Sequence, residues 1–176
     1  MGALSPRPSW QTASRGETRS RIWPGTSRSL PLPSRRRSVA SLTDEKRLKE
    51  AVYYLDESIY SRVLASAMQA AGANVRRVGV DVSYGSPDEV WLEIVGKNNW
   101  IALMRDQKIR RRRLETDALK AHGVAVFAFT GGQETAQQTA QTICPLLIKF
   151  ANMNVSEPKP LLYTFGVSGS LSKVKL

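Results

Sequence analysis

The sequence predicts an α/β fold with a mostly parallel central sheet. From about residue 41, short apolar runs alternate with stretches of helical periodicity, which is the pattern of strands joined by helices. A hydrophobic fraction of 41% and a charged fraction of 23% are those of a globular protein, and 176 residues suffice for one domain with tails. Strands that alternate with helices are expected to be parallel, with right-handed crossovers and helices on both sheet faces.

The apolar runs place the strands. They are bounded by turn-forming residues and rich in Val, Ile, Leu, Phe and Tyr, as buried strands are. We expect strands at residues 51–55, 74–80, 100–104, 124–129, 161–167 and 171–176. The last two are joined by the turn residues 168–170 and should form a hairpin.

Helical patterns occupy the intervals between the strands. They run from Ile59 to Gly72, from Ser86 to Val95, from Leu114 to His122 and from Glu134 to Met153. Ser86 is placed to cap the second helix, with Pro87 at its first helical position. Glycines at 72 and 123 end two of the helices, and Pro145 should kink or break the last one.

The N-terminal part has a different character. Residues 1 to about 40 hold eight arginines against one acid, Glu17, interleaved with Ser and Pro, and contribute +7 of the net charge of +11. We predict a disordered basic extension over residues 1–48 and a folded domain over residues 49–176. Three interpretations of the extension stay open: an arm that contacts RNA, an organellar transit peptide, or upstream sequence included by a misplaced start.

Cysteine usage and apolar run length bear on the compartment. Cys144 is the only cysteine, so no internal disulfide can form and a reducing compartment is expected. No run approaches the length needed to span a bilayer, and no apolar segment follows the N-terminal charges as in a signal peptide. We therefore expect a cytoplasmic protein with no membrane partner.

Three aspartates lie where a parallel sheet would bring them together. Asp56 and Asp106 each follow an apolar strand closely, and Asp88 lies in the first turn of a helix that should face the same edge. Carboxylates so close repel each other unless a cation lies among them, and oxygen ligands suit Mg²⁺ or Mn²⁺ rather than zinc. Such a site predicts hydrolysis of a phosphodiester, and Glu89 is a further candidate ligand.

Each acid also has a structural explanation. Asp56 is equally suited to ending a strand, and Asp88 to the helix dipole. Asp106 is also placed to pair with the basic residues that follow it. The joint placement of the three favours the metal site.

Basic and hydroxyl residues are predicted near the acids. The densest basic run of the domain surrounds the third acid, and Thr130 ends a strand before Gly131 and Gly132. These positions suit RNA phosphate contact, with a solvated loop, a surface for an acidic protein segment or a plain tight turn as alternatives. The RNA-binding candidates are Arg105, Lys108, Arg110, Arg111, Arg112, Arg113 and Thr130.

Four segments carry a resemblance to a known family. They are YLDES (54–58), SPDEVWLEIVGKNNW (86–100), IALMRDQKIRRRR (101–113) and VFAFTGG (126–132). Together, in this order, they resemble the PIN-like ribonuclease domains of VapC-type toxins, from about Val52 to Leu176. The family's three acids fall on Asp56, Asp88 and Asp106.

The resemblance implies a fold and a function. The fold is a PIN-like three-layer α/β/α arrangement with a mostly parallel central sheet and a C-terminal β-hairpin. The function is that of an Mg²⁺- or Mn²⁺-dependent endoribonuclease, the toxin of a type II toxin-antitoxin pair, held inactive by its antitoxin protein and commonly a homodimer. The chain departs from the family at Met104, where many relatives carry Thr or Ser, and at Gln107 and Lys108, where a fourth acid is frequent.

Two rival functions follow from these departures and from the strand-end acids. One is a PIN-like module that binds RNA or protein but no longer cuts. The other is a receiver-type signalling domain, for which Asp56 and Glu57 supply the early acid pair but Thr130 stands where a lysine is required.

Overall fold

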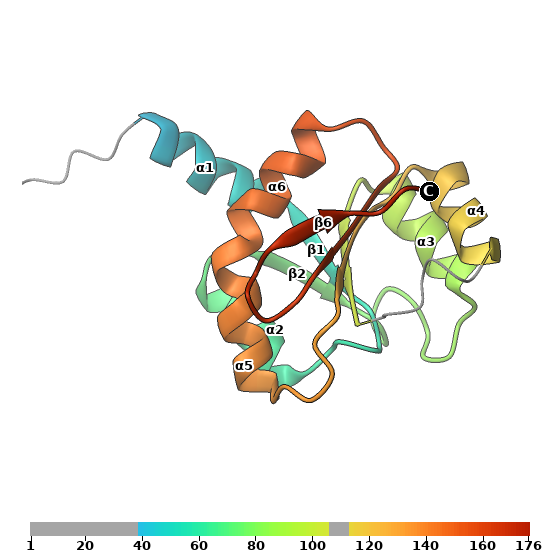
Figure 1. Ribbon diagram of the computed structural model, residues 1–176, viewed down its shortest axis with the longest axis horizontal. Helices are drawn as coiled ribbons and strands as arrows, with labels where there is room; N and C mark the ends of the chain where they lie inside the picture. The colour runs from blue at the N-terminus through green and yellow to red at the C-terminus, as the bar shows by residue number, and fades with distance from the viewer. Residues whose placement is uncertain (1–38, 106–112) are drawn as a thin grey trace, which may run out of the picture. The chain divides into compact units, whose positions relative to one another are not determined.

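A six-stranded sheet runs through the described part of the chain, residues 39–105 and 113–176 of the computed structural model (Figure 1). Its order is β2-β1-β3-β4-β5-β6. Strands β1 to β5 pair in parallel, and β6 pairs antiparallel with β5, which confirms the predicted mostly parallel sheet and C-terminal hairpin. The strands are β1 (Val52–Leu55), β2 (Asn74–Arg77), β3 (Ile101–Met104), β4 (Ala125–Phe129), β5 (Leu161–Phe165) and β6 (Leu171–Lys173).

Helices cover both faces of the sheet, as predicted. Helices α3 and α4 lie on one face, and α1, α2, α5 and α6 lie on the other (Figure 1). This arrangement confirms the three layers. The helices are α1 (Val39–Glu50), α2 (Arg62–Ala70), α3 (Asp88–Lys97), α4 (Arg113–His122), α5 (Ala136–Ile143), the 3-10 turn η2 (Cys144–Leu146) and α6 (Leu147–Ser156).

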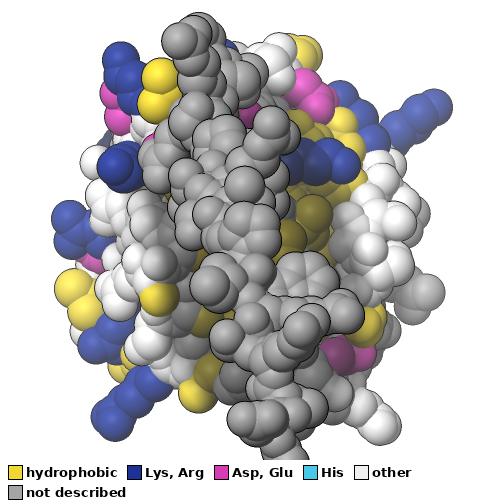
Figure 2. All heavy atoms as spheres, turned by 90° about the vertical axis from the view of Figure 1, so that its left-hand side faces the viewer, with side chains coloured by type: hydrophobic (Ala, Val, Ile, Leu, Met, Phe, Trp, Pro, Cys, Tyr) yellow, Lys and Arg dark blue, Asp and Glu magenta, His cyan; other side chains and the backbone are white. Residues whose placement is uncertain are grey.

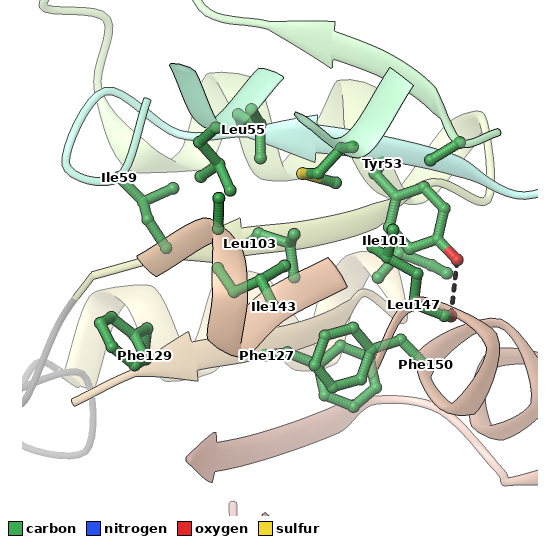
Figure 3. Close-up of a cluster of buried hydrophobic side chains, with 14 of the residues drawn as sticks. Tyr53, Leu55, Ile59, Ile101, Leu103, Phe127, Phe129, Ile143, Leu147 and Phe150 are labelled. Atoms are coloured by element: carbon green, nitrogen blue, oxygen red, sulfur yellow. Dashed lines mark hydrogen bonds between the residues drawn. The ribbon is translucent and has the colours of Figure 1, made fainter. Parts of the chain in front are cut away.

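The larger core lies between the sheet and the layer of α1, α2, α5 and α6 (Figure 3). Alternate residues of the central strands point into it, as the two-residue period of a strand requires. Phe127 of β4 stacks on Phe150 of α6 with ring centroids 4.1 Å apart. The Tyr53 hydroxyl donates to the carbonyl oxygen of Leu147 at 2.7 Å, so this buried polar group is satisfied.

Helix α1 begins ten residues before the predicted domain start at residue 49. Its periodicity is weak in sequence because most of its side chains are polar. It is fixed by tertiary contacts: Leu48 is buried, Arg47 Nη1 donates to Asn152 Oδ1 at 2.7 Å, and Asn152 Nδ2 donates to Asp44 Oδ1 at 3.1 Å. Most of the predicted extension, residues 1–38, lies outside the described residues.

Element boundaries differ from the prediction where glycine or a cap decides them. Strand β2 ends at Arg77, not at residue 80, because Gly79 adopts φ +82° and turns the chain. The prediction that Ser86 caps α3 is wrong: Pro87 occupies that position, with no side-chain cap. Helix α2 begins after Ser61, whose hydroxyl accepts from the Leu64 amide at 3.1 Å. The predicted break at Pro145 is confirmed by η2.

Positive charge is spread over the face shown in Figure 2. The visible Lys and Arg side chains lie at several separate places rather than in one continuous patch.

A helix that spans a membrane has to be both long and apolar. Within residues 39–105 and 113–176, no helix combines the length and the apolar character needed to cross a membrane.

Candidate active site

Asp56 is held at the carboxyl end of β1 by hydrogen bonds to both its backbone and its side chain. Its amide donates to the carbonyl oxygen of Leu103 in the neighbouring β3 at 3.0 Å. Its Oδ2 accepts from the amide of Ser58 at 3.0 Å and from the Ser58 hydroxyl at 2.5 Å. These two bonds to Oδ2 fix the orientation of the carboxylate.

Ser58 links the end of β1 to the segment that follows β3. Its Oγ donates to Asp56 Oδ2 and also accepts from the Arg105 amide at 2.9 Å. Arg105 directly precedes Asp106, the third predicted acid, which lies outside the described residues. One hydroxyl thus connects the first acid to Arg105, the residue that follows β3.

Asp88 is the first residue of α3, and a buried tryptophan orients it. Trp91 Nε1 donates to Asp88 Oδ1 at 2.9 Å. The Trp91 ring stacks on Tyr54 of β1, with centroids 5.7 Å apart. Trp91 belongs to the core, and its indole N–H also positions a carboxylate.

Asp56 and Asp88 line the same cavity, of about 310 Å³, which we call the acid cavity. Glu89 is exposed and is not among the residues that line it. The described lining residues include no lysine or arginine, so two aspartates and one glutamate give them a net charge of −3. They are Tyr54, Asp56, Glu57, Ser58, Val78, Val82, Ser83, Gly85, Ser86, Asp88 and Trp91.

Of the lining residues that were not predicted as site residues, two carry ionisable side chains, Glu57 and Tyr54. Glu57 follows Asp56 directly, and its Oε2 accepts from the Gly85 amide at 3.4 Å. Its position next to Asp56 in the sequence was the signal that could have identified Glu57 as a site residue. Tyr54 carries no such signal, because within the pattern of β1 it reads as one more buried aromatic residue.

The Tyr54 hydroxyl is a buried donor beside the acids. It has no hydrogen-bond partner among the described residues, although such groups are nearly always paired in folded proteins. Burial raises the pKa of Tyr54 well above its ordinary value, and the charges of Asp56, Asp81 and Glu57 raise it further. Tyr54 therefore stays protonated and has a proton to donate into its surroundings.

The side-chain atoms of the acid cavity that could bind a metal ion are oxygens. Carboxylates, hydroxyls and backbone carbonyls suit a hard cation such as Mg²⁺ or Mn²⁺. Within the described ranges, no group of three or more Asp, Glu, His or Cys side chains is arranged to hold a metal ion. Asp106, the third predicted acid, directly follows the described residue Arg105 in the sequence.

The described RNA-binding candidates take part in contacts within the fold. Arg105 Nη2 donates to Thr139 Oγ1 at 2.9 Å, and its guanidinium lies 5.4 Å from the centroid of the Phe129 ring. The amide and hydroxyl of Thr130 both donate to the Phe165 carbonyl oxygen, at 2.8 and 3.2 Å. Outside the described residues lie Lys108, Arg110, Arg111, Arg112 and the side chain of Arg113.

The two glycines after Thr130 differ in their surroundings, which gives a matched test. A Cβ on Gly131 would lie 2.4 Å from the Phe129 ring and 2.4 Å from Glu134 Oε2, whereas a Cβ on Gly132 would meet nothing within 4 Å. Gly131→Ala should lower the free energy of unfolding by about 1–3 kcal/mol through overpacking, and Gly132→Ala should change it by less than about 0.5 kcal/mol. Urea unfolding of both variants checks this, and equal effects would contradict it.

Comparison with known proteins adds one finding to this geometry. No curated protein and no solved structure matches the chain. The segment that runs from the residue before β1 to the turn after β4, and so holds the acid cavity, does match a family model. Residues 51–131 match the family described as PIN like domain.

Proposed function

We propose that this protein is a metal-dependent endoribonuclease that hydrolyses RNA phosphodiester bonds. The observation that carries the proposal is the shared cavity of Asp56 and Asp88 at the carboxyl edge of the parallel sheet. Open α/β sheets bind their ligands at this edge. The match to the PIN like domain supports the same reaction, because domains of this family are commonly nucleases.

Asp56, Asp88 and Asp106 would hold Mg²⁺ or Mn²⁺, and Glu57 and Glu89 are further candidate ligands. The fit is chemical: the lining donors are oxygens, and an unbalanced charge of −3 in one cavity calls for a cation. When bound, such a cation activates water for attack and stabilises negative charge on the phosphate.

The other residues of the site would orient and donate. Ser58 fixes the Asp56 carboxylate through Oδ2, and Trp91 fixes that of Asp88 through Oδ1. The protonated Tyr54 hydroxyl would donate a hydrogen bond to an oxygen brought in with the substrate, which would satisfy a group that is otherwise buried without a partner. This arrangement pre-organises the acids before the RNA arrives.

We further propose that the protein acts as the toxin of a type II toxin-antitoxin pair, with an antitoxin protein as partner and a homodimer as the assembly. The sequence resemblance to VapC-type toxins supports this. A small adjacent reading frame that encodes a DNA-binding protein with an acidic or Arg-bearing tail would strengthen the assignment, and a lone gene would count against it.

The second candidate is a PIN-like module that binds RNA or protein without cutting. Met104 is buried at the end of β3 where many relatives carry Thr or Ser, and the described residues alone hold no group of three metal ligands. In this case the acid cavity would serve binding alone.

Metal-dependent cleavage separates the two candidates. The full chain, incubated with end-labelled single-stranded RNA, should produce fragments on addition of Mn²⁺ or Mg²⁺ and none with a chelator in excess. Asp106→Asn should abolish fragment formation, because it removes the carboxylate that completes the site. Intact RNA at every metal concentration would reject the nuclease and leave the binding module.

A further inference from the structure

A second cavity, of about 310 Å³, lies at edge strand β2 and has the opposite charge. We call it the basic cavity. Three arginines and one aspartate among its lining residues leave a net charge of +2, compared with −3 around the acid cavity. The residues that matter here are Tyr60, Arg62, Arg76, Arg77 and Asp81.

The two cavities share structural elements. Arg77, the last residue of β2, pairs in register with Leu55, the last residue of β1, and Asp56 follows Leu55 directly. Tyr60 belongs to the turn that Asp56 opens, and its amide donates to the Asp56 carbonyl oxygen at 2.9 Å. An extended polyanion bound in the basic cavity would therefore lie beside the acids.

Arg62 is placed where helix stability does not explain it. It is the first residue of α2 and is exposed, with Ser61 as the N-cap. The helix dipole is positive at this end, so a cation here is unfavourable for the helix by a few tenths of a kcal/mol, roughly. A negatively charged ligand in the basic cavity would turn this cost into an attraction.

Arg77 presents a pre-oriented guanidinium. Its Cζ lies 5.1 Å from the centroid of the Tyr60 ring, which holds the planar group by cation–π attraction. Its Nη1 reaches the Val78 carbonyl oxygen and the Tyr84 hydroxyl only at 3.5 Å, the long limit of a hydrogen bond. With respect to the described residues, most of its N–H groups are thus still available to a phosphate.

Arg76 and Asp81 largely offset each other. Arg76 Nη1 lies 3.4 Å from Asp81 Oδ1, and its guanidinium lies over the ring of Trp100. The attraction for an anion therefore comes mainly from the side of the cavity that holds Arg62, Arg77 and Tyr60.

We infer that the basic cavity binds the phosphate backbone of single-stranded RNA next to the acid cavity. The inference rests on the proposed function. It supplies cations that the described lining of the acid cavity lacks, because lining residues with a net charge of −3 repel a phosphodiester until cations are near them. Arginines beside an aromatic ring are the usual surface for a single strand. Since they contact phosphates, they position the RNA without reading its sequence.

Binding without cleavage tests the inference separately from catalysis. The full chain carrying Asp56→Asn is titrated, in excess chelator, into fluorescein-labelled single-stranded RNA, and anisotropy is recorded at several salt concentrations. Arg62→Gln with Arg77→Gln is compared with a control that removes two exposed cations elsewhere, Lys149→Gln with Lys175→Gln. Both double variants keep the basic N-terminal residues. Any contribution of those residues to RNA binding is therefore the same in both and cancels in the comparison.

The arginine pair should weaken RNA binding on the order of tenfold or more and lower the salt slope by about 1.4, since each lost phosphate contact on a single strand contributes about 0.7. The lysine pair should change affinity by less than about threefold. Arg62→Gln alone, which disturbs no packing, should lower the slope by about 0.7 while thermal unfolding stays unchanged.

Two results would overturn the inference. The first is equal weakening by the two double variants. The second is unchanged RNA binding by the folded arginine variant, and if that variant also bound a labelled poly-glutamate peptide more weakly, the cavity would be assigned to an acidic polypeptide. A protein that binds RNA through these arginines but never cuts would keep the inference and reject the nuclease.

Discussion

Asp56→Asn is expected to slow RNA cleavage by roughly a hundred- to a thousandfold while leaving the fold intact. A bound cation contributes several kcal/mol to phosphoryl chemistry, and each 1.4 kcal/mol or so is a factor of ten in rate. Asparagine has the shape of aspartate and can still accept the Ser58 hydrogen bonds through its amide oxygen. The loss would therefore report the charge of this side chain and not its packing.

The matched control is Asp117→Asn, which removes the same charge from an exposed position on α4. It should cleave within about twofold of the unaltered chain, since exposed charges away from a site contribute little. Initial rates with Mn²⁺ and an end-labelled RNA measure both variants. Equal losses in the two would show that net charge, and not the acid cavity, governs cleavage.

Phe127→Ala is expected to lower the free energy of unfolding by about 3–5 kcal/mol. Phe127 lies in the middle of β4 with no exposed surface, and it stacks on both Phe150 and Tyr163. Removing the ring leaves a void between the sheet and α6 that these aromatic neighbours cannot fill without leaving their own contacts. Urea unfolding followed by circular dichroism measures the change.

Val155→Ala serves as the control. Val155 lies on α6, the helix that carries Phe150, but 69% of its surface is exposed. It should shift the free energy of unfolding by less than about 0.5 kcal/mol. A loss below about 1 kcal/mol for Phe127→Ala would mean that the core between β4 and α6 is not closely packed.

The centre of the sheet could be predicted because its strands β3 and β4 are buried on both faces. Residues 101–104 and 125–129 are buried without exception, so they appear in sequence as continuous apolar runs. Helix α1 could not be predicted in the same way. Its place depends on Leu48 and on polar contacts with Asn152, more than a hundred residues away in the chain.

The candidate site shows a similar division. Asp56 and Asp88 could be placed at one edge because parallel strands bring their carboxyl ends together. The roles of Ser58 and Trp91 depend on which side chains meet across the fold. An ordinary turn serine and a core tryptophan carry no sign of such contacts.

The two borders of the sheet limit how copies of this protein can associate. Strand β2 has four residues and ends in two arginines, and β6 has three residues and ends in a lysine. Short borders rich in positive charge resist strand-to-strand joining, which protects a protein from polymerising through its sheets. In a symmetric pair of copies, contact through surfaces other than these two borders would therefore be favoured.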